Sequence, residues 1–255
     1  MSAAASPRSS SGPFDDPVRR AAELARQWES LPTPELIRRC ATVLPGPWAV
    51  GSAFGREGVV LLHLVREVGL DFPVLFLDTG YHFPETLAFR DAVASELGLS
   101  VHSLRPEETV AEQDVRLGAY LHDRDPDLCC RLRKVEPLAR ALAGFSGWFT
   151  GIRRDQSPGR SQAPVVEWQP VSADHGVFKV NPLARWTRRE IEVYHAEHRL
   201  PSHPLWAAGF PSVGCAPCTR AIAPGAPERA GRWAGTGKSE CGIHTLGLRV
   251  PTRTP

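Results

Sequence analysis

Short apolar runs alternate with longer amphipathic stretches along residues 33–150. Apolar runs bounded by Gly and Pro are typical of buried strands, whereas apolar positions recurring every three or four residues indicate helices. The expected strands are 48–52, 74–77, 101–104 and 148–150, and the expected helices are 59–68, 85–97 and one that begins at Thr33 as N-cap and ends before Pro45. This alternation with short links predicts an α/β fold, with a mostly parallel sheet flanked by helices and joined by right-handed crossovers.

Two further elements follow the expected parallel strands. Residues 165–169 and 177–180 are predicted to pair as strands across the turn at Asp174-His175-Gly176. Thr187 and Glu190 have the spacing of a capping box, which predicts a helix from there to about His198.

The chain from Pro201 onward has a different character, because it is dense in Pro, Gly and Cys and shows little periodicity. Such a segment would not build a core of its own, so its cysteines are the candidates for ordering it. We therefore expect a disordered N-terminal tail at 1–13, an α/β domain at 14–200, and a Cys-rich, mobile segment at 201–255 packed on the same domain.

Composition narrows the classes of protein. The 255 residues are 42% hydrophobic and carry 30 basic against 28 acidic side chains, a net charge of +2. This balance gives no general attraction to nucleic acid or to an anionic membrane, so neither is an expected partner. Residues 1–13 lack the apolar run of a secretory signal, although a short transit peptide has a similar composition. We expect a cytoplasmic protein, and in that reducing compartment six cysteines suit metal binding or catalysis better than disulfides.

The first strand-to-helix junction, residues 52–58, is a candidate anion site. Backbone N–H groups at such a junction attract phosphate or sulfate, which points to Ser52 and Gly55. The turn matches neither the dinucleotide glycine fingerprint nor a Walker loop. Asp78 and Thr79 follow the second strand at the same edge of the sheet, and helix capping explains them equally well.

The cysteines carry more information. Cys129 and Cys130 are adjacent, and Cys215 and Cys218 form a C-x-x-C pair. Four thiolates are enough to close a metal site, and adjacent cysteines suit a [4Fe–4S] cluster better than a single tetrahedral zinc. The alternative is that all four are reduced structural cysteines.

Cys241 is left over after four ligands are counted. His244 follows three residues later and could act as an acid/base or charge-stabilising neighbour, which suits a nucleophilic thiol. Basic residues recur beside each proposed site element, and Arg matches the oxygens of a sulfate ester in a bidentate way. They are Arg131, Arg133, Lys134, Arg153, Arg154, Arg160, Arg229 and Arg232.

Seven stretches together resemble one family. They are 52–57, LDTGYHFPET at 77–86, CCRLRKVEPL at 129–138, GIRRDQSPGR at 151–160, KVNPLARWT at 179–187, GCAPCTR at 214–220 and ECGIH at 240–244. The chain from about Trp48 to His244 thus resembles the assimilatory adenylyl-sulfate reductases, the cluster-bearing branch of the phosphoadenylyl-sulfate reductase family.

The resemblance implies an adenine-nucleotide α-hydrolase-like fold and a [4Fe–4S] cluster on Cys129, Cys130, Cys215 and Cys218. It implies that Cys241 attacks the sulfur of adenylyl sulfate, AMP leaves, and thioredoxin or a glutaredoxin-like thiol releases sulfite from the S-sulfocysteine. The matching substrate positions are Lys134, Arg229 and Arg232 for the phosphosulfate, Ser52, Gly55 and Arg160 for the nucleotide, and also Asp78 and His244.

Three alternatives stay open at this point. The substrate could be phosphoadenylyl sulfate, or both nucleotides could be reduced. A non-redox nucleotide-binding or RNA-binding module stapled by zinc would also explain the sheet and four cysteines, but it leaves residues 240–244 without a role. Residues 125–128 lack the basic residue that family members often have before the paired cysteines, and His122 is the candidate replacement. The sequence does not decide whether the protein forms a homo-oligomer.

Overall fold

A six-stranded sheet organises the computed structural model, which describes residues 16–244. Its strands are β1 (Trp48–Gly51), β2 (Val74–Leu77), β3 (Val101–Leu104), β4 (Gly147–Phe149), β5 (Val166–Pro170) and β6 (Gly176–Val180). They lie in the order β3-β2-β1-β4-β6-β5, and all neighbours are parallel except β5 and β6. The predicted mostly parallel α/β sheet, with its antiparallel last pair, is confirmed.

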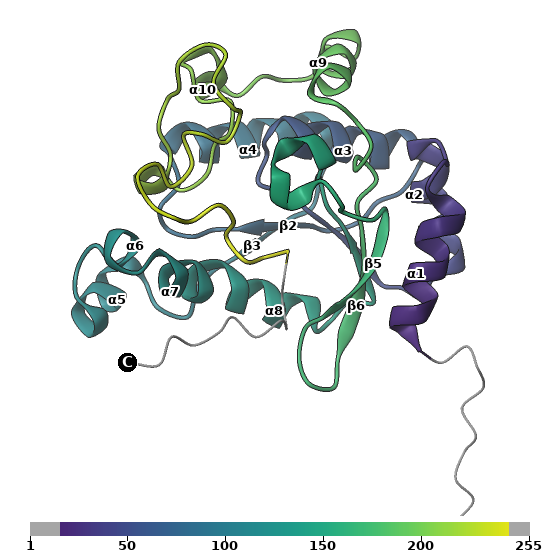
Figure 1. Cartoon of the computed structure of the whole chain (residues 1–255), viewed down its shortest axis with the longest axis horizontal. Coiled ribbons are helices and arrows are strands. Elements are labelled where there is room, and N and C mark those ends of the chain that lie inside the picture. Colours follow the sequence, from purple (N-terminus) through teal and green to yellow (C-terminus); the bar gives the residue numbers. More distant parts are fainter. Residues whose placement is uncertain (1–15, 245–255) are drawn as a thin grey trace, which may run out of the picture.

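Helices cover both faces of this sheet. They are α1 (Pro17–Trp28), α2 (Thr33–Val43), α3 (Arg56–Glu67), α4 (Pro84–Leu97), α5 (Val110–Leu117), α6 (Leu121–Arg124), α7 (Pro126–Cys130), α8 (Glu136–Leu142), α9 (Arg188–Glu197) and α10 (Pro204–Ala207). Figure 1 shows α3 and α4 on one side of the sheet and α5 to α8 on the other. Between α7 and α8 the chain makes a π-helical turn at Arg131–Val135.

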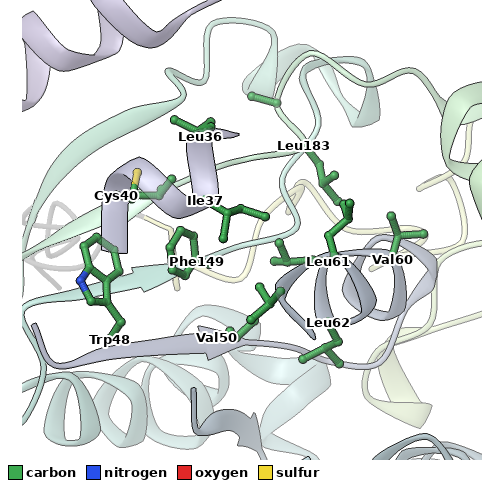
Figure 2. Close-up of a cluster of buried hydrophobic side chains, with 14 of the residues drawn as sticks. Leu36, Ile37, Cys40, Trp48, Val50, Val60, Leu61, Leu62, Phe149 and Leu183 are labelled. Atoms are coloured by element: carbon green, nitrogen blue, oxygen red, sulfur yellow. The ribbon is translucent and has the colours of Figure 1, made fainter. Parts of the chain in front are cut away.

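The pleat of β1 explains the two hydrophobic layers. Trp48 and Val50 face the larger cluster, which Figure 2 shows gathered from α2, α3, β1 and β4, whereas Ala49 faces the smaller one under α8. Successive side chains of a strand point to opposite faces, so a strand covered on both sides is apolar throughout. Phe149 of β4 is fully buried and stacks on Trp48 with 4.9 Å between ring centroids.

One helix start differs from the expectation. Thr33 is not the N-cap of α2, because Pro32 occupies that position without a side-chain cap. The Thr33 hydroxyl instead donates to the carbonyl of Pro182 and accepts from the indole N–H of Trp186. A contact with a residue 149 positions away has therefore replaced the local cap.

The segment after residue 200 has few regular elements but lies against the α/β layers. The Ala216 N–H donates to the Tyr81 carbonyl at 2.7 Å. The side chains of Gln169 and Lys179 donate to the carbonyls of Ile243 and His244. The mobility expected of this segment stays a prediction, and the expected tail at 1–13 and the end of the chain at 245–255 lie outside the described residues.

No helix in the described part of the chain is long and apolar enough to cross a membrane.

Candidate active site

A cleft of about 220 Å³ lies at the carboxyl ends of β1, β2 and β4. The chain reaches it through the loops that follow these strands, and the segment after residue 210 completes its wall. The predicted residues that line it are Ser52, Gly55, Lys134, Arg160, Arg229, Arg232, Cys241 and His244. In open parallel sheets this edge is where ligands bind, because helix N-termini converge there.

The loop from Ser52 to α3 brings the start of the helix close to the Ser52 side chain. Phe54 adopts a left-handed backbone conformation with φ of 55°, which a non-glycine residue rarely does, and its ring is fully buried. The Ser52 hydroxyl accepts the N–H of Phe54 at 3.0 Å. A Cβ on Gly58 would lie 2.5 Å from the Ser52 oxygen, so only glycine lets the helix start against this serine.

Four of the predicted basic residues meet in the cleft. Lys134 comes from the π-helical turn, Arg160 follows β4, and Arg229 and Arg232 belong to the C-terminal segment. Lys134 is 8% exposed. Burial alone would lower the pKa of Lys134, but the negative charges that Cys215, Cys241 and Cys130 carry as thiolates outweigh it and raise the pKa. Lys134 is therefore a charged residue of the cleft wall.

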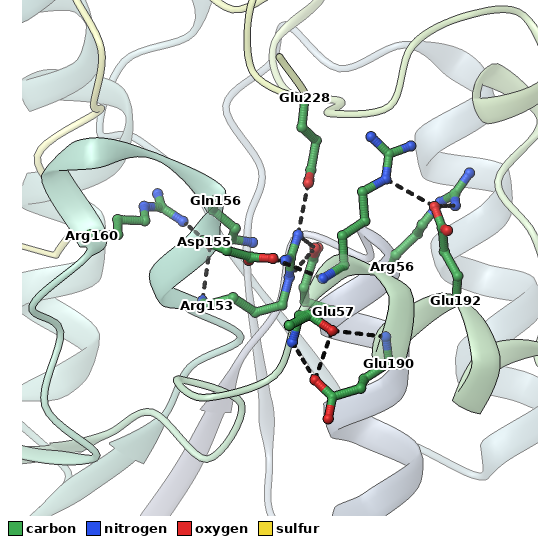
Figure 3. Close-up of polar contacts among 11 residues, drawn as sticks. Arg56, Glu57, Arg153, Asp155, Gln156, Arg160, Glu190, Glu192 and Glu228 are labelled. Carbon is green, nitrogen blue, oxygen red and sulfur yellow. Dashed lines mark hydrogen bonds and ion pairs between the residues drawn. The ribbon is translucent and has the colours of Figure 1, made fainter. Parts of the chain in front are cut away.

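The other predicted basic residues have structural partners. Arg153 is fully buried, and Figure 3 shows its guanidinium between Glu57 and Glu228. It lies 2.9 Å from Glu57 and 2.7 Å from Glu228, and it also contacts Asp155. This network ties the first turn of α3 to the C-terminal segment beside Arg229.

Arg133, Arg154 and Arg131 likewise lie outside the cleft lining. Arg133 donates to the carbonyl of Thr79 and to the side chain of Gln113. Arg154 pairs with Glu29, and Arg131 is exposed beside Glu136.

Cys241 lies in the cleft wall, and two arginines hold the side chain of the preceding residue, Glu240. Glu240 accepts two hydrogen bonds from Arg160, each of 2.7 Å, and one of 3.2 Å from Arg229. Burial would raise the pKa of Glu240, but the Arg160 hydrogen bonds and the charges of Arg160 and Arg229 hold it below its ordinary value. The carboxylate therefore holds the Cys241 segment against two of the cleft cations.

His244 stacks on Trp148, with ring centroids 6.2 Å apart. Burial, followed by the charges of Lys179, Arg160 and Arg229, lowers the pKa of His244 well below its ordinary value. The imidazole is therefore neutral at neutral pH. It can exchange a proton, but it does not supply the positive charge that the sequence alone allowed.

The four cysteines expected to act as ligands line one small cavity next to the cleft. Lys134 and Cys215 line both spaces and so form part of the wall between them. Burial raises the pKa of Cys129 to about 12, and the nearby thiols of Cys130, Cys215 and Cys218 add to this. In residues 16–244, no three His, Cys, Asp or Glu side chains are arranged to hold a metal ion.

Among the residues predicted to bind the substrate, Asp78 is the one that does not line the cleft. Its carboxylate pairs with Arg105 at 3.1 Å, and the neighbouring Thr79 lines the cleft instead. The Thr79 hydroxyl is 3.3 Å from the Cys215 sulfur. His122 lines the cysteine cavity, beside the ring of Tyr81.

Sequence reasoning missed several residues of the cleft, Glu57 and Trp233 among them. Glu57 stands at the start of α3, and Trp233 lies directly after Arg232. Glu57 falls in the turn expected before the helix at 59–68, where nothing in the sequence marked it for a role in the cleft. The signal for Trp233 was an aromatic residue placed among three cations, Arg229, Arg232 and Lys238.

Fold and cleft together define a class of protein. A parallel sheet whose carboxyl edge carries clustered cations and a cysteine suits an enzyme that binds an anionic nucleotide and attacks it with a thiol. The phosphoadenosine phosphosulfate reductase domain matches residues 47–221. The chain belongs to this family.

Individual relatives agree with this assignment. An adenosine 5'-phosphosulfate reductase of Streptomyces coelicolor is 46% identical over 219 residues, covering 86% of this chain and 91% of that protein. A phosphoadenosine 5'-phosphosulfate reductase of Gloeobacter violaceus is 45% identical, with 87% and 92% covered. The solved structure of phosphoadenylyl-sulfate reductase from Candida auris, in a phosphate complex, matches with a TM-score of 0.69 at 28% identity, covering 80% of this chain and 98% of that one. The predicted family and fold class are confirmed.

Proposed function

We propose that the protein reduces adenylyl sulfate to sulfite and AMP, in the assimilation of sulfate for cysteine biosynthesis. The observation that carries the proposal is that Cys241 lines the same cleft as Lys134, Arg160, Arg229 and Arg232. A thiol beside this many cations is well placed to attack the sulfur of a phosphosulfate, whose sulfate and phosphate groups each carry a negative charge.

The reaction has two steps. In the first, the Cys241 thiolate forms a bond to the sulfur while the bond from sulfur to the phosphate oxygen breaks. AMP leaves with that electron pair, and an S-sulfocysteine remains. In the second, a thiolate of thioredoxin or a glutaredoxin-like protein attacks the Cys241 sulfur, and sulfite leaves with two electrons. The second thiol of the reductant then frees Cys241, and the reductant ends as a disulfide.

Charge stabilisation is the part of catalysis that the cleft cations supply. Negative charge moves onto the bridging phosphate oxygen as AMP leaves, and Lys134, Arg229 and Arg232, which line the cleft, are proposed to stabilise it. Ser52, Gly55 and Arg160 are proposed to contact the nucleotide. Gly55 is the N-cap of α3, so the backbone N–H groups at this helix start could bind the phosphate of the nucleotide. The neutral His244 would serve as a hydrogen-bonding contact for the substrate.

We also propose that Cys129, Cys130, Cys215 and Cys218 hold a [4Fe–4S] cluster. All four line one cavity, and their mutual repulsion as thiolates calls for a cationic partner there. A bound cluster would offset part of the charge of the four thiolates and leave a net negative charge behind Lys134. Lys134 would then couple the charge of the cysteine cavity to the charge of the substrate.

Phosphoadenylyl sulfate is the second candidate substrate. The relatives divide between the two names at nearly equal identity, 46% and 45%. We favour the unphosphorylated nucleotide, because in the family the cluster cysteines usually accompany it. A substrate with an additional 3′-phosphate would need a further cation site in the cleft.

Sulfite release from both nucleotides, measured side by side with reduced thioredoxin, tests the proposal. We expect turnover by the wild type, more strongly with adenylyl sulfate, and none by Cys241→Ser. Cys40→Ala is the matched control, since Cys40 is buried in α2 far from the cleft lining and its loss should leave turnover intact. An active Cys241→Ser enzyme would refute the proposed nucleophile.

The need for a dithiol reductant also fits the proposed cytoplasmic location, where thioredoxin is kept reduced. Absorbance near ~400 nm after anaerobic purification would support the cluster, whereas a colourless, zinc-loaded protein would contradict it.

A further inference from the structure

One indole ring lies among four cations at the wall of the cleft. The ring of Trp233 has the Arg232 guanidinium at 4.6 Å from its centroid, Arg229 and Lys238 each at 5.8 Å, and Lys134 at 6.0 Å. Cations within about 6 Å of a ring face are attracted by its quadrupole, and Trp is the strongest of the aromatic residues in this respect. The ring therefore opposes the mutual repulsion of these charges.

The four cations differ in their other partners. Arg229 pairs with Glu240, and Lys238 contacts Asp127. Within the described residues, Lys134 and Arg232 have no carboxylate partner, and the Nε of Arg232 is buried without an acceptor. Both side chains line the cleft. Lys134 and Arg232, the two cations that lack a carboxylate, are thus both free to meet an anion in the cleft, as Arg229 is only in part.

The position of Trp233 is costly to maintain. Its backbone has φ of 50°, in the left-handed region that bulky residues avoid. Its side chain is 4% exposed, and its indole N–H has no acceptor in the described part of the chain. An apolar side chain without an N–H would avoid burying an unpaired donor, so burial of apolar surface alone does not explain a tryptophan here.

The backbone of Trp233 also joins two parts of the site. Its N–H donates to the carbonyl of Cys218 at 3.0 Å, and its carbonyl accepts from Thr236. The turn that carries the ring is therefore fastened to the turn that carries two of the cysteines. This places the indole at a set position relative to Lys134, which comes from a different element.

We propose that Trp233 is a positioning residue that holds Arg232 and Lys134 ready for the phosphosulfate, because its ring face attracts both cations and neither has a carboxylate partner among the described residues. The inference rests on the proposed function for the identity of the anion. The substrate oxygens provide negative charge when they bind. Because Trp233 already holds the two cations close together, binding does not have to meet the cost of ordering them.

Equilibrium binding of adenylyl sulfate, measured by titration calorimetry in a Cys241→Ser background, tests this without turnover. We expect Trp233→Leu to weaken binding about tenfold and Trp233→Phe, which keeps a ring face, to weaken it by no more than about threefold. The Leu variant should also show a steeper loss of affinity with added KCl, since unpartnered cations recruit counter-ions from solution. Trp186→Leu, outside the cleft lining, is the matched control and should bind as the parent does.

Fluorinated tryptophan provides a second test that does not depend on the folding of the Leu variant. Fluorine withdraws density from the ring face with little change of shape. Incorporated at all seven tryptophans, it should weaken binding stepwise with the number of fluorines, and the effect should vanish in Trp233→Phe. Parent-like binding by the Leu variant, equal losses in the Leu and Phe variants, or insensitivity to fluorine would each overturn the inference.

The two proposals fail separately. If the wild type releases no sulfite while Trp233 variants lose affinity as described, the proposed reaction falls and the positioning role stands. If the wild type turns over but the variants bind normally, only the role of Trp233 falls. A parent protein that does not bind adenylyl sulfate would overturn the positioning role whatever the turnover shows.

Discussion

The α/β layers of residues 17–200 and the irregular segment of residues 201–244 are stabilised by different interactions. The layers bury two hydrophobic clusters, one on each face of the sheet. In the described part of the segment, the buried apolar side chains are those of Cys215 and Trp233. Trp206 and Ile243 pack against the two clusters, and ion pairs hold the segment at the cleft, such as those of Arg160 with Glu240 and Arg153 with Glu228. Apolar burial therefore stabilises the layers, whereas ion pairs hold the residue next to Cys241 at the cleft.

Two arginine–carboxylate pairs make this difference concrete. In the layers, Arg154 donates to both oxygens of Glu29 at 2.6 and 3.0 Å. Between layers and segment, Arg160 donates to both oxygens of Glu240 at 2.7 Å. The chemistry is the same, but only the second pair holds the residue next to Cys241. The Arg154–Glu29 pair thus stabilises the layers, whereas the Arg160–Glu240 pair also holds the chain next to Cys241.

Phe149→Ala should have the largest effect of these variants, by destabilising the α/β layers. The side chain is fully buried, so its removal leaves a cavity and should lower the free energy of unfolding by ~3–5 kcal/mol. Urea denaturation followed by circular dichroism measures this. Val115→Ala, at a position 90% exposed, serves as the control and should change almost nothing. A loss below ~1 kcal/mol for Phe149→Ala would contradict the view that apolar burial holds this region.

Lys134→Ala should damage the site without damaging the layers. A buried cation facing the substrate contributes charge stabilisation of the order of a hundredfold in turnover, and that should be lost. The absorbance of the proposed cluster should remain, because the four cysteines are untouched. Arg131→Ala, an exposed cation in the same π-helical turn, is the control. Unchanged turnover by the Lys134 variant would dispose of the proposed coupling role.

Glu240→Gln should loosen the segment that carries Cys241. Losing the charge-assisted bonds from Arg160 and Arg229 removes roughly 1 kcal/mol of docking, so alkylation of Cys241 by iodoacetamide should become about fivefold faster. Glu29→Gln breaks the matched pair and should leave this rate unchanged, although unfolding becomes slightly easier. Equal alkylation rates in the two variants would remove the functional distinction between the pairs.

The smallest expected effect is the pH dependence of the stability that the Glu240 ion pairs contribute. The folded pKa of Glu240 lies below its ordinary value of about 4.3, so the carboxylate stabilises the folded state fully above that value. This contribution is lost as the pH falls through the folded pKa. The difference in unfolding free energy between wild type and Glu240→Gln should therefore be constant near neutral pH and shrink below about pH 4. A difference that grows on acidification would have the wrong sign.

Much of the fold was predictable, because strands leave a local signal. The expected strands at 74–77 and 101–104 coincide with β2 and β3, and the capping box at Thr187 is present as expected. α1, α5 to α8 and α10 were not predicted. α5 to α7 are short, and α1 packs against β5, a strand distant in sequence.

The candidate site was predictable in its chemistry but not in its geometry. Residue types and spacing along the chain determined which thiols, cations and glycines were candidates, since the motifs are local. Only the tertiary structure decided that Asp78 pairs with Arg105, that Arg153 is buried among carboxylates, and that Arg160 reaches the residue beside Cys241. Arg160 and Glu240 are 80 positions apart, and Arg153 and Glu228 are 75 apart. Such contacts depend on the order of the strands and the path of the last segment, which no local pattern of residues encodes.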